Sequence, residues 1–285
     1  MAEPAWKTLH GESGEPDEDE SGTVLLQRVV ERPDGRLELL ERPPTLEDYL
    51  DPQLEDKLFQ GKIHALVRRT LADILYRYFR LDAEMLVLED CKVLLGPGLP
   101  GPGPDVSLIR GARYPDADFE SYDVVEQGAL PCLLIEVVSP KDRRIREMDE
   151  VDKKALYEQA GILEYLLVDP PRRATGRRFR VRGYRLGPGR RYQPIEPGDD
   201  GRLLSGTTGL RFGVTPDGQW IEVFVGATGE RLLTSWEAED KAAREEEARK
   251  AAEEKASHEE EARKAAEEEI ARLRAEIERL KQPPK

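Results

Sequence analysis

Apolar and polar residues alternate on both sides of a turn sequence near the start of the patterned region. The segment TVLLQRVVERPDGRLELLERP, from residue 23, predicts two strands joined at PDG, and TLEDYLDPQ then marks the start of a region expected to be helical. From Leu54 to Phe79 apolar residues recur at helical spacing, so a long amphipathic helix packed on a sheet is expected. Its buried arc should contain Ile63, Leu66, Val67, Thr70, Leu71, Ile74 and Tyr78.

Strands and helices then alternate through the middle of the chain. A helix is expected from about Arg144 to Ala160, because Gly161 follows at the position where helices commonly end. β-Hairpin material is expected at 177–226, with turns at RGYRLGPGR, EPGDDGR and TPDGQ. Alternation of this kind predicts a mixed α/β (α+β) sandwich. The other strands are expected at 85–96, 105–109, 132–139 and 164–169.

The last segment changes abruptly in composition to Ala, Glu, Lys and Arg from about Leu232. EEEARKAAEE occurs at 245–254 and again at 259–268, two heptads apart. One interpretation is a coiled coil, and the other is a single solvated helix held by i,i+4 charge pairs. The residues that fit a coiled-coil seam are Ala266, Ile270, Leu273, Ile277 and Leu280.

Composition supports three parts. The chain has 285 residues, 38% hydrophobic and 36% charged, which suits one domain of roughly 200 residues with polar extensions. Residues 1–22 are acidic, lack periodicity and are expected to be disordered. The expected division is a tail at 1–22, a globular domain at 23–230, and a charged helical or coiled-coil tail at 231–285.

Neither a secretion signal nor a membrane span is indicated, because the longest apolar run, LPCLLIEVV, is short and contains Glu136. Cys91 and Cys132 have no CxxC spacing, so we expect two reduced cysteines rather than a disulfide framework or a zinc cluster. These features predict a cytoplasmic protein that does not contact membranes.

The net charge of −14 is unevenly distributed, with −6 in residues 1–22, −5 in 23–230 and −3 in 231–285. Within the mildly acidic body, RRATGRRFRVRGYRLGPGRR at 172–191 contains nine arginines and no acid. Guanidinium groups suit phosphate oxygens, and the neighbouring Phe179 and Tyr184 could stack on bases, so DNA is an expected partner. The alternative is a solvated hairpin whose arginines pair with acids elsewhere. The expected nucleic-acid-binding residues are Arg172, Arg173, Arg177, Arg178, Arg180 and Arg182.

Glu136 is the most informative acidic residue, since both faces of CLLIEVVS are apolar and an unpaired buried charge is costly. A bound cation would compensate it, and Mg²⁺ is typically held by one or two carboxylates with waters and phosphates. Asp105, at the start of DVSLI, is the candidate second ligand. The alternatives are a buried ion pair with an arginine for Glu136 and a turn-forming role for Asp105.

The helix after Glu136 supplies further candidates. With Ile145 as the origin and 100° per residue, the expected buried arc contains Met148, Val151 and Leu156, and Lys154 faces solvent. Asp149, Lys153 and Tyr157 form a stripe at the margin of that arc, from which a side chain can reach toward Glu136. The alternative is a surface ion pair between Asp149 and Lys153.

These residues carry a resemblance. GPD at 103–105, IEVVSP at 135–140 and DEVDKKALYEQAGILEYLLVDP at 149–170 together resemble the Uma-two (Uma2) family of PD-(D/E)XK restriction-endonuclease-like proteins, common in bacterial genomes. TLEDYL, the helix with His64, and RYQPIEPGDDGRLLSGTTGLRFGV extend the likeness over roughly 45–230.

The resemblance implies a restriction-endonuclease-like core, a mixed β-sheet flanked by helices. It matches Asp105 and Glu136 to the family's acidic pair, and implies Mg²⁺ or Mn²⁺ as cofactor. Val138 stands where the family's lysine is expected, and Lys153 on the following helix fits the place that a lysine takes in relatives. Lys92 is a second candidate lysine, and His64 occupies a family-like position, although a satisfied buried histidine is its alternative.

The sequence therefore predicts a Mg²⁺-dependent DNA endonuclease with Asp105, Glu136 and Lys153 as catalytic residues and a homodimer that could form through its C-terminal helix. A different class of function is a non-catalytic nuclease-fold module that recruits a partner through that helix. A two-carboxylate glycosidase ranks last, because aromatic residues are only 6% of the chain.

Overall fold

The computed structural model describes residues 26–32, 34–53, 57–58, 61–139, 146–171 and 176–280. The expected disordered tail at 1–22 therefore lies outside the described residues. The chain separates into two compact units, Met1–Leu232 and Leu233–Lys285. None of the described helices is both long and apolar enough to cross a membrane.

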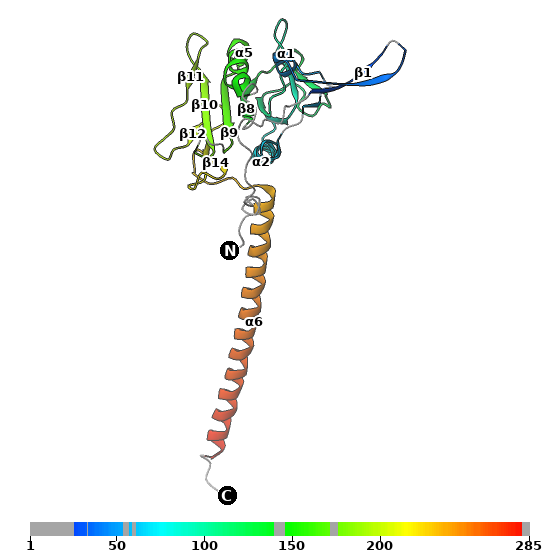
Figure 1. Ribbon diagram of the computed structural model, residues 1–285. Coiled ribbons are helices and arrows are strands. Elements are labelled where there is room, and N and C mark those ends of the chain that lie inside the picture. The colour runs from blue at the N-terminus through cyan, green and yellow to red at the C-terminus, as the bar shows by residue number, and fades with distance from the viewer. Residues whose placement is uncertain are drawn as a thin grey trace. The chain divides into compact units, whose positions relative to one another are not determined.

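A six-stranded mixed sheet forms the centre of the first unit, with strand order β11-β10-β9-β8-β6-β4 (Figure 1). The parallel pair is β8 with β9, and the other neighbours in this sheet are antiparallel. The expectation of a mixed sheet flanked by helices is therefore confirmed. The strands are β4 (Met85–Glu89), β6 (Val106–Arg110), β8 (Pro131–Val137), β9 (Glu164–Asp169), β10 (Arg180–Leu186) and β11 (Tyr192–Pro194).

Strand β8 is buried on both faces, which explains its almost continuous apolar sequence. Leu133, Ile135 and Val137 belong to one apolar cluster, which also contains residues of helix α2 (Lys62–Phe79). Leu134 and Val138 belong to a second cluster, which contains residues of helix α5 (Lys153–Ala160). Since side chains alternate along a strand, Glu136 shares the face of Leu134 and Val138.

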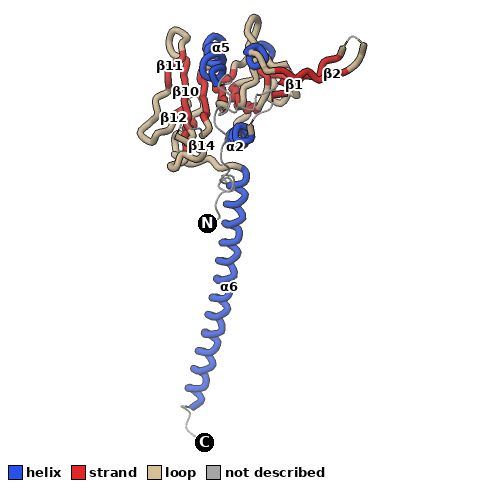
Figure 2. The backbone as a smooth tube through the Cα atoms, viewed as in Figure 1, coloured by secondary structure: helices blue, strands red, loops and turns tan. Residues whose placement is uncertain are grey.

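Smaller elements surround the central sheet. The hairpin of β1 (Leu26–Glu31) and β2 (Leu37–Arg42) matches the two strands expected around PDG, and Figure 2 shows it extending from the rest of this unit. Strand β1 also pairs with β3 (Lys57–Leu58). The others are α1 (Leu46–Leu50), β5 (Lys92–Leu94), β7 (Ser121–Asp123), α3 (Val124–Gln127), β12 (Leu203–Leu204), β13 (Leu210–Val214) and β14 (Ile221–Val225).

Two expected elements are shorter than predicted. Helix α2 begins at Lys62 after Gly61 rather than at Leu54, and β3 precedes it. Its buried face includes Val67, Leu71 and Ile74 as expected, whereas Tyr78 is 38% exposed and Phe79 is buried instead. The strand expected at 85–96 divides into β4 and β5 because Asp90, with φ of 51°, turns the chain between them.

The second unit contains α6 (Ser235–Leu280), a helix of 46 residues that matches the helix expected after about Leu232. Its side chains, where they are described, are mostly exposed and carry i,i+4 ion pairs such as Lys250 with Glu246 at 2.7 Å. These pairs fit a helix that is stable in water, because each pair adds a small stabilisation to the helix surface.

Candidate functional site

The two candidate metal ligands lie on neighbouring strands at the same end of the sheet. Asp105 precedes β6 and Glu136 lies in β8, and the antiparallel register pairs Val106 with Ile135. Continuing this register by one residue places Asp105 opposite Glu136. Both carboxylates are buried, with Asp105 3% and Glu136 2% exposed.

Glu136 is held by two side chains of α5. Its Oε1 lies 2.9 Å from Lys153 Nζ and accepts a hydrogen bond of 2.8 Å from the Tyr157 hydroxyl. Burial raises the pKa of Glu136 to about 8, with nearby carboxylates adding to the rise and Lys153 opposing it. Burial, reinforced by Glu136, raises the pKa of Tyr157 well above its usual range, so its hydroxyl stays protonated as a donor.

Asp105 has a different environment, although it is also buried. Its Oδ2 accepts a hydrogen bond from the Val137 amide at 2.7 Å and lies 3.2 Å from His64 Nε2. Burial alone would raise its pKa, but the hydrogen bond and the charge interaction with His64, together with Lys153, lower it. His64 Nδ1 is buried without a hydrogen-bond partner. The shifts in pKa thus favour the protonated form of Glu136 and the ionised form of Asp105.

Lys153 joins Glu136 to Asp149. Its Nζ lies 3.2 Å from Asp149 Oδ1, and both residues are buried, which excludes the alternative of a surface pair. Burial alone would lower the pKa of Lys153, but the surrounding carboxylates raise it, so the ammonium stays charged. Burial raises the pKa of Asp149 to about 6, and its carbonyl oxygen accepts a hydrogen bond from Tyr165.

A wide helical turn produces this arrangement. Residues Met148–Asp152 form a π-helical turn, named η2, whose last hydrogen bond runs from the Lys153 amide to the Met148 carbonyl. The extra residue shifts the phase of the preceding turn, so the expected buried arc is wrong at Val151, which is 57% exposed. Lys154 does not simply face solvent either, because its Nζ lies 3.9 Å from the centroid of the Tyr184 ring.

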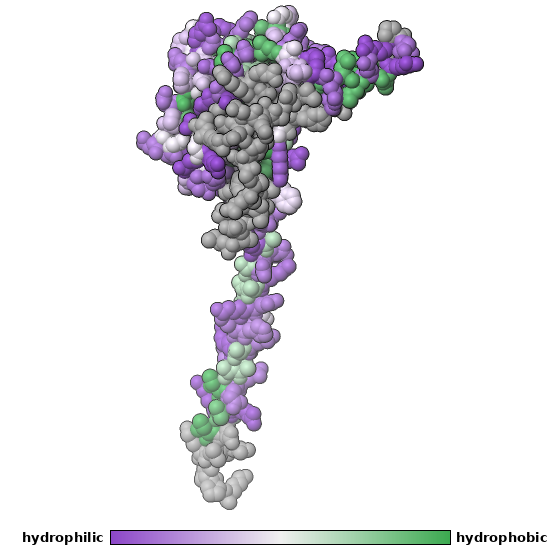
Figure 3. All heavy atoms as spheres, viewed as in Figure 1, coloured by the Kyte–Doolittle hydropathy of each residue, from purple (hydrophilic) through white to green (hydrophobic). Residues whose placement is uncertain are grey.

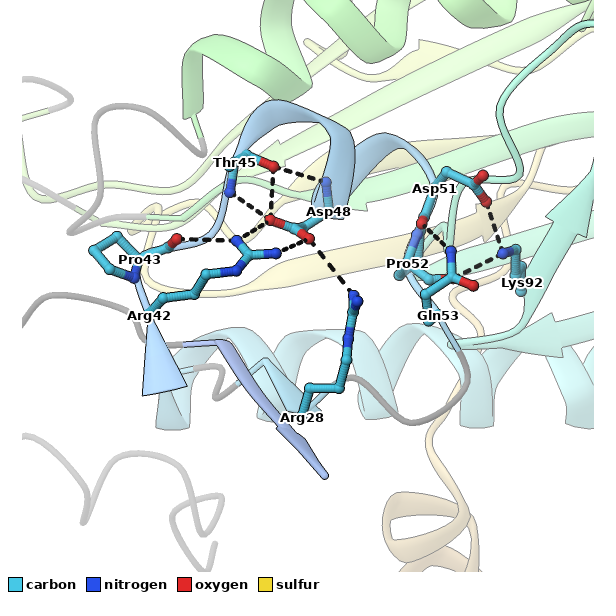
Figure 4. A network of polar contacts seen from close by, with 9 residues as sticks. All are labelled: Arg28, Arg42, Pro43, Thr45, Asp48, Asp51, Pro52, Gln53 and Lys92. Carbon is cyan, nitrogen blue, oxygen red and sulfur yellow. Dashed lines mark hydrogen bonds and ion pairs between the residues drawn. The ribbon is translucent and has the colours of Figure 1, made fainter. Parts of the chain in front are cut away.

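The second candidate lysine is engaged elsewhere. Lys92 Nζ lies 2.7 Å from Asp51 Oδ1 and donates to the Pro52 carbonyl at 2.8 Å, as Figure 4 shows. Within the described residues it contacts neither Asp105 nor Glu136. The same view shows Asp48, whose carboxylate accepts hydrogen bonds from Arg42 and from the amide of Thr45, the N-cap residue of α1. Lys92 thus fixes the chain after α1 and is not part of the buried cluster.

Arg68 belongs to the surroundings of the site but was missed from the sequence. It lies one helical turn after His64 on α2, and its NH1 is 3.9 Å from Asp105 Oδ1 and 2.8 Å from Asp90 Oδ2. Its Nε donates to Glu89 at 3.1 Å. The i,i+4 spacing from His64 was a usable signal, since residues four apart share a helix face.

The arginine-rich segment is only partly described, and Arg172 and Arg173 lie outside the described residues. Arg177, Arg178 and Arg180 are exposed, and Arg178 donates to the Pro216 carbonyl at 2.9 Å. Arg182 pairs with Glu150 at 2.6 Å, as the alternative of a self-paired hairpin predicts for that residue.

The two aromatic rings of this segment belong to the folded body. Phe179 is 3% exposed and packs edge-on against Trp220, and Tyr184 stacks on Tyr165. The expectation of stacking on bases is therefore wrong for Phe179, which is buried. Tyr184 is partly exposed, and its ring already contacts Tyr165 and Lys154.

The buried cluster has the donor set of a hard divalent cation. Asp105, Glu136 and Asp149 outnumber the ammonium of Lys153, so the cluster holds excess buried negative charge when all three are ionised. Within the described part of the chain, no group of three or more His, Cys, Asp and Glu side chains is arranged to hold a metal. Two carboxylates with waters and phosphates are nevertheless a common Mg²⁺ environment, so Asp105 and Glu136 fit that ion.

Comparisons with known proteins found one matching family model and a distant solved structure. A family model described as "Uma2: Putative restriction endonuclease" matches residues 35–227. A solved structure titled as a "putative nuclease belonging to DUF820" from Anabaena variabilis is 18% identical, with a TM-score of 0.35, over 50% of this chain and 71% of that chain. No curated protein matches the chain. The family model covers more than half of the chain.

Proposed function

Since the chain belongs to the Uma2 family of nucleases, we propose that it is a metal-dependent endonuclease that hydrolyses phosphodiester bonds in DNA. The observation that carries this proposal is the buried cluster in which Asp105 and Glu136 lie opposite each other while Lys153 contacts Glu136 at 2.9 Å. This cluster supplies metal ligands and a fixed positive charge at one end of the sheet.

Asp105 and Glu136 would hold Mg²⁺ or Mn²⁺. The bound ion would supply a Lewis acid that polarises the phosphate and acidifies a water. Lys153 orients the attacking water or stabilises the negative charge that develops on the phosphate. His64 and the Val137 amide position Asp105, while Tyr157 positions Glu136 and Asp149 positions Lys153.

The exposed Arg177 and Arg180 support DNA as the substrate. Neither makes an ion pair within the described residues, so both guanidinium groups are available to phosphate oxygens. Arg172, Arg173 and Arg178 complete the proposed contact segment, whereas Arg182 is already paired with Glu150. Contacts of this kind fix the register of the duplex and carry no base information, so they predict no sequence preference.

The proposal predicts metal-dependent nicking of supercoiled plasmid that requires Glu136. We expect wild type to nick with Mg²⁺ or Mn²⁺, and Glu136→Gln and Glu136→Ala to lose about 100-fold or more in rate, because each variant removes a carboxyl group that would bind the metal. The measurement is the conversion of supercoiled to open-circular DNA over time. Glu147→Gln is the control, because Glu147 is exposed on the adjacent helical turn. Nicking that continues in a metal chelator, or that survives in both Glu136 variants, would refute the proposal.

Metal binding is expected to raise the melting temperature of the wild type, because a ligand that binds only the native state stabilises it by mass action. Asp105→Ala/Glu136→Ala should show no such shift. Thermal denaturation with increasing Mn²⁺ or Mg²⁺ measures this without any nuclease assay. Equal shifts in the two proteins would place the bound metal elsewhere.

The second candidate function is the non-catalytic nuclease-fold module. It is favoured by the contacts of Glu136 Oε1, since Lys153 and Tyr157 already compensate this carboxylate without a metal. A wild type that shows neither a metal-induced shift nor nicking would support this candidate.

A further inference from the structure

The long helix α6 leaves its largest apolar side chains unburied. Ile270, Leu273 and Ile277 are 50%, 49% and 52% exposed, and Figure 3 shows the most strongly apolar residues of α6, in dark green, gathered toward its C-terminal end. They recur at alternating spacings of three and four residues, which places them on one stripe of the helix. Ion pairs along α6 stabilise a single helix but leave this stripe in water.

We propose that α6 joins two copies of this chain in a parallel, in-register, two-stranded coiled coil that closes from its C-terminal heptads. This proposal does not depend on nuclease activity. With Ile270 and Ile277 at heptad position a, Leu273 falls at position d. In a parallel coiled coil, isoleucine at a with leucine at d favours two strands over three or four, and each residue packs on its own counterpart.

The charged flanks favour the same direction. In a parallel pair, a residue at position g faces the residue five positions later, at position e, in the other copy. The pairs that result are opposite in charge, namely Lys241 with Glu246, Lys255 with Glu260, and Glu269 with Arg274. An antiparallel pair would instead align the e positions with one another, where five glutamates occur: Glu239, Glu246, Glu253, Glu260 and Glu267.

Charged residues at the a and d positions of the seam favour the antiparallel direction instead. Glu245 and Glu259 occupy d positions and Arg249 and Arg263 occupy a positions, so a parallel pair places like charges together. An antiparallel pair centred at residue 254 would instead set Glu245 against Arg263 and Arg249 against Glu259. That antiparallel register, however, places Ile270 opposite Ala238 and leaves Ile277 beyond the start of α6 at Ser235. Apolar burial and the e and g pairs outweigh the seam charges, which weaken the pairing before residue 266. The dimer should therefore be strongest over residues 266–280.

Cysteine cross-linking in the full chain tests the direction and register. Ala266 lies at position d and Ala265 at position c, so the two adjacent alanines form a matched pair. Oxidation with diamide should convert Ala266→Cys to a disulfide-linked dimer on a non-reducing denaturing gel. Ala265→Cys should remain mostly without this cross-link, because a disulfide requires close Cβ atoms. Both variants retain Cys91 and the buried Cys132, so the background is the same. Light scattering of unoxidised wild type should give twice the mass of one chain.

Mixing Ala266→Cys with a larger, tagged Ala242→Cys separates the alternatives. Ala242 faces Ala266 only in the antiparallel register centred at residue 254. A mixed covalent dimer without the symmetric Ala266→Cys dimer would overturn the parallel direction. A cross-linking yield for Ala266→Cys no greater than that for Ala265→Cys, with light scattering that gives one chain, would overturn the dimer and leave a single solvated helix.

Discussion

Lys153→Ala is expected to lower the single-turnover rate of DNA cleavage by about 100-fold or more, the scale for losing one preorganised electrostatic group. Lys153 Nζ lies 2.9 Å from Glu136 Oε1 and 3.2 Å from Asp149 Oδ1, so its charge is fixed before substrate binds. Water cannot replace that charge easily, because Lys153 is only 6% exposed. Single-turnover cleavage with saturating Mg²⁺ measures the loss.

The adjacent Lys154 is an internal control with the same side chain. Its ammonium lies over the Tyr184 ring at 3.9 Å and contacts neither Glu136 nor Asp149 within the described residues. Lys154→Ala should therefore change the cleavage rate little and cause only a small loss of stability, because it removes a cation–π contact. Circular dichroism and thermal melting check that both variants are folded.

Lys153→Arg tests whether charge alone is sufficient. The planar guanidinium is larger than an ammonium and cannot occupy the compact position between Glu136 and Asp149, so we expect the rate to stay low. Equal losses for Lys153→Ala and Lys154→Ala would show that the lysines act through bulk charge. Lys92 would then become the next candidate to test, despite its contact with Asp51.

Each carboxylate could be singled out from the sequence because its signal is local. Glu136 interrupts an apolar strand that is buried on both faces, and Asp105 directly precedes another strand. Periodicity does not show which strands pair, so the family resemblance was needed to link the two residues. In the structure, the antiparallel register of β6 and β8 places the two residues opposite each other. An error in the predicted start or end of a strand does not change which of the two sheet faces a residue within it occupies, because side chains alternate strictly.

The helix that carries Lys153 was harder to predict because helix phase is sensitive to one residue. The π-helical turn at Met148–Asp152 adds a residue, which exposes Val151 and buries Asp149. A fixed rotation of 100° per residue cannot represent such a turn. The stripe of Asp149, Lys153 and Tyr157 was identified, but its members are buried rather than marginal.

Contacts between segments far apart in the chain could not be predicted from the sequence. Arg68 reaches Asp105 from α2, and Glu164 receives hydrogen bonds from a loop about forty residues later, as the separations of 41 to 43 residues show. Neither partner can be identified from periodicity, because the pairing depends on how α2 and the loop pack on the sheet. The apolar run that predicts β9 does not indicate which residues bind Glu164.

Glu164→Gln is expected to lower the free energy of unfolding by about 3 kcal/mol, the scale for breaking a buried, hydrogen-bonded charge. Glu164 is 0% exposed. Its carboxylate accepts hydrogen bonds from Ser205 Oγ at 2.5 Å, the Gly206 amide at 2.9 Å and Thr207 Oγ1 at 2.7 Å, and it pairs with Arg185 Nε at 2.7 Å. An amide group would present a donor where these partners are donors. Urea denaturation at pH 7 measures the loss.

The pH dependence separates the charge from the shape of this side chain. Burial would raise the pKa of Glu164, but hydrogen bonds from Ser205, Thr207 and Arg185 lower it below its usual value. A lowered pKa means that the stabilisation is present above the unfolded pKa of about 4.3 and is lost as the pH falls through the folded pKa. The gap in stability between wild type and Glu164→Gln should therefore narrow in acid.

Glu230→Gln is the control for this experiment, because Glu230 is exposed and no hydrogen bond or ion pair of its side chain occurs within the described residues. It should leave stability nearly unchanged at every pH. A Glu164→Gln variant as stable as Glu230→Gln at pH 7 would show that the loop at 205–209 does not depend on the carboxylate. A large loss that stays constant into acid would instead assign the effect to packing, since the charge of the wild-type carboxylate disappears there.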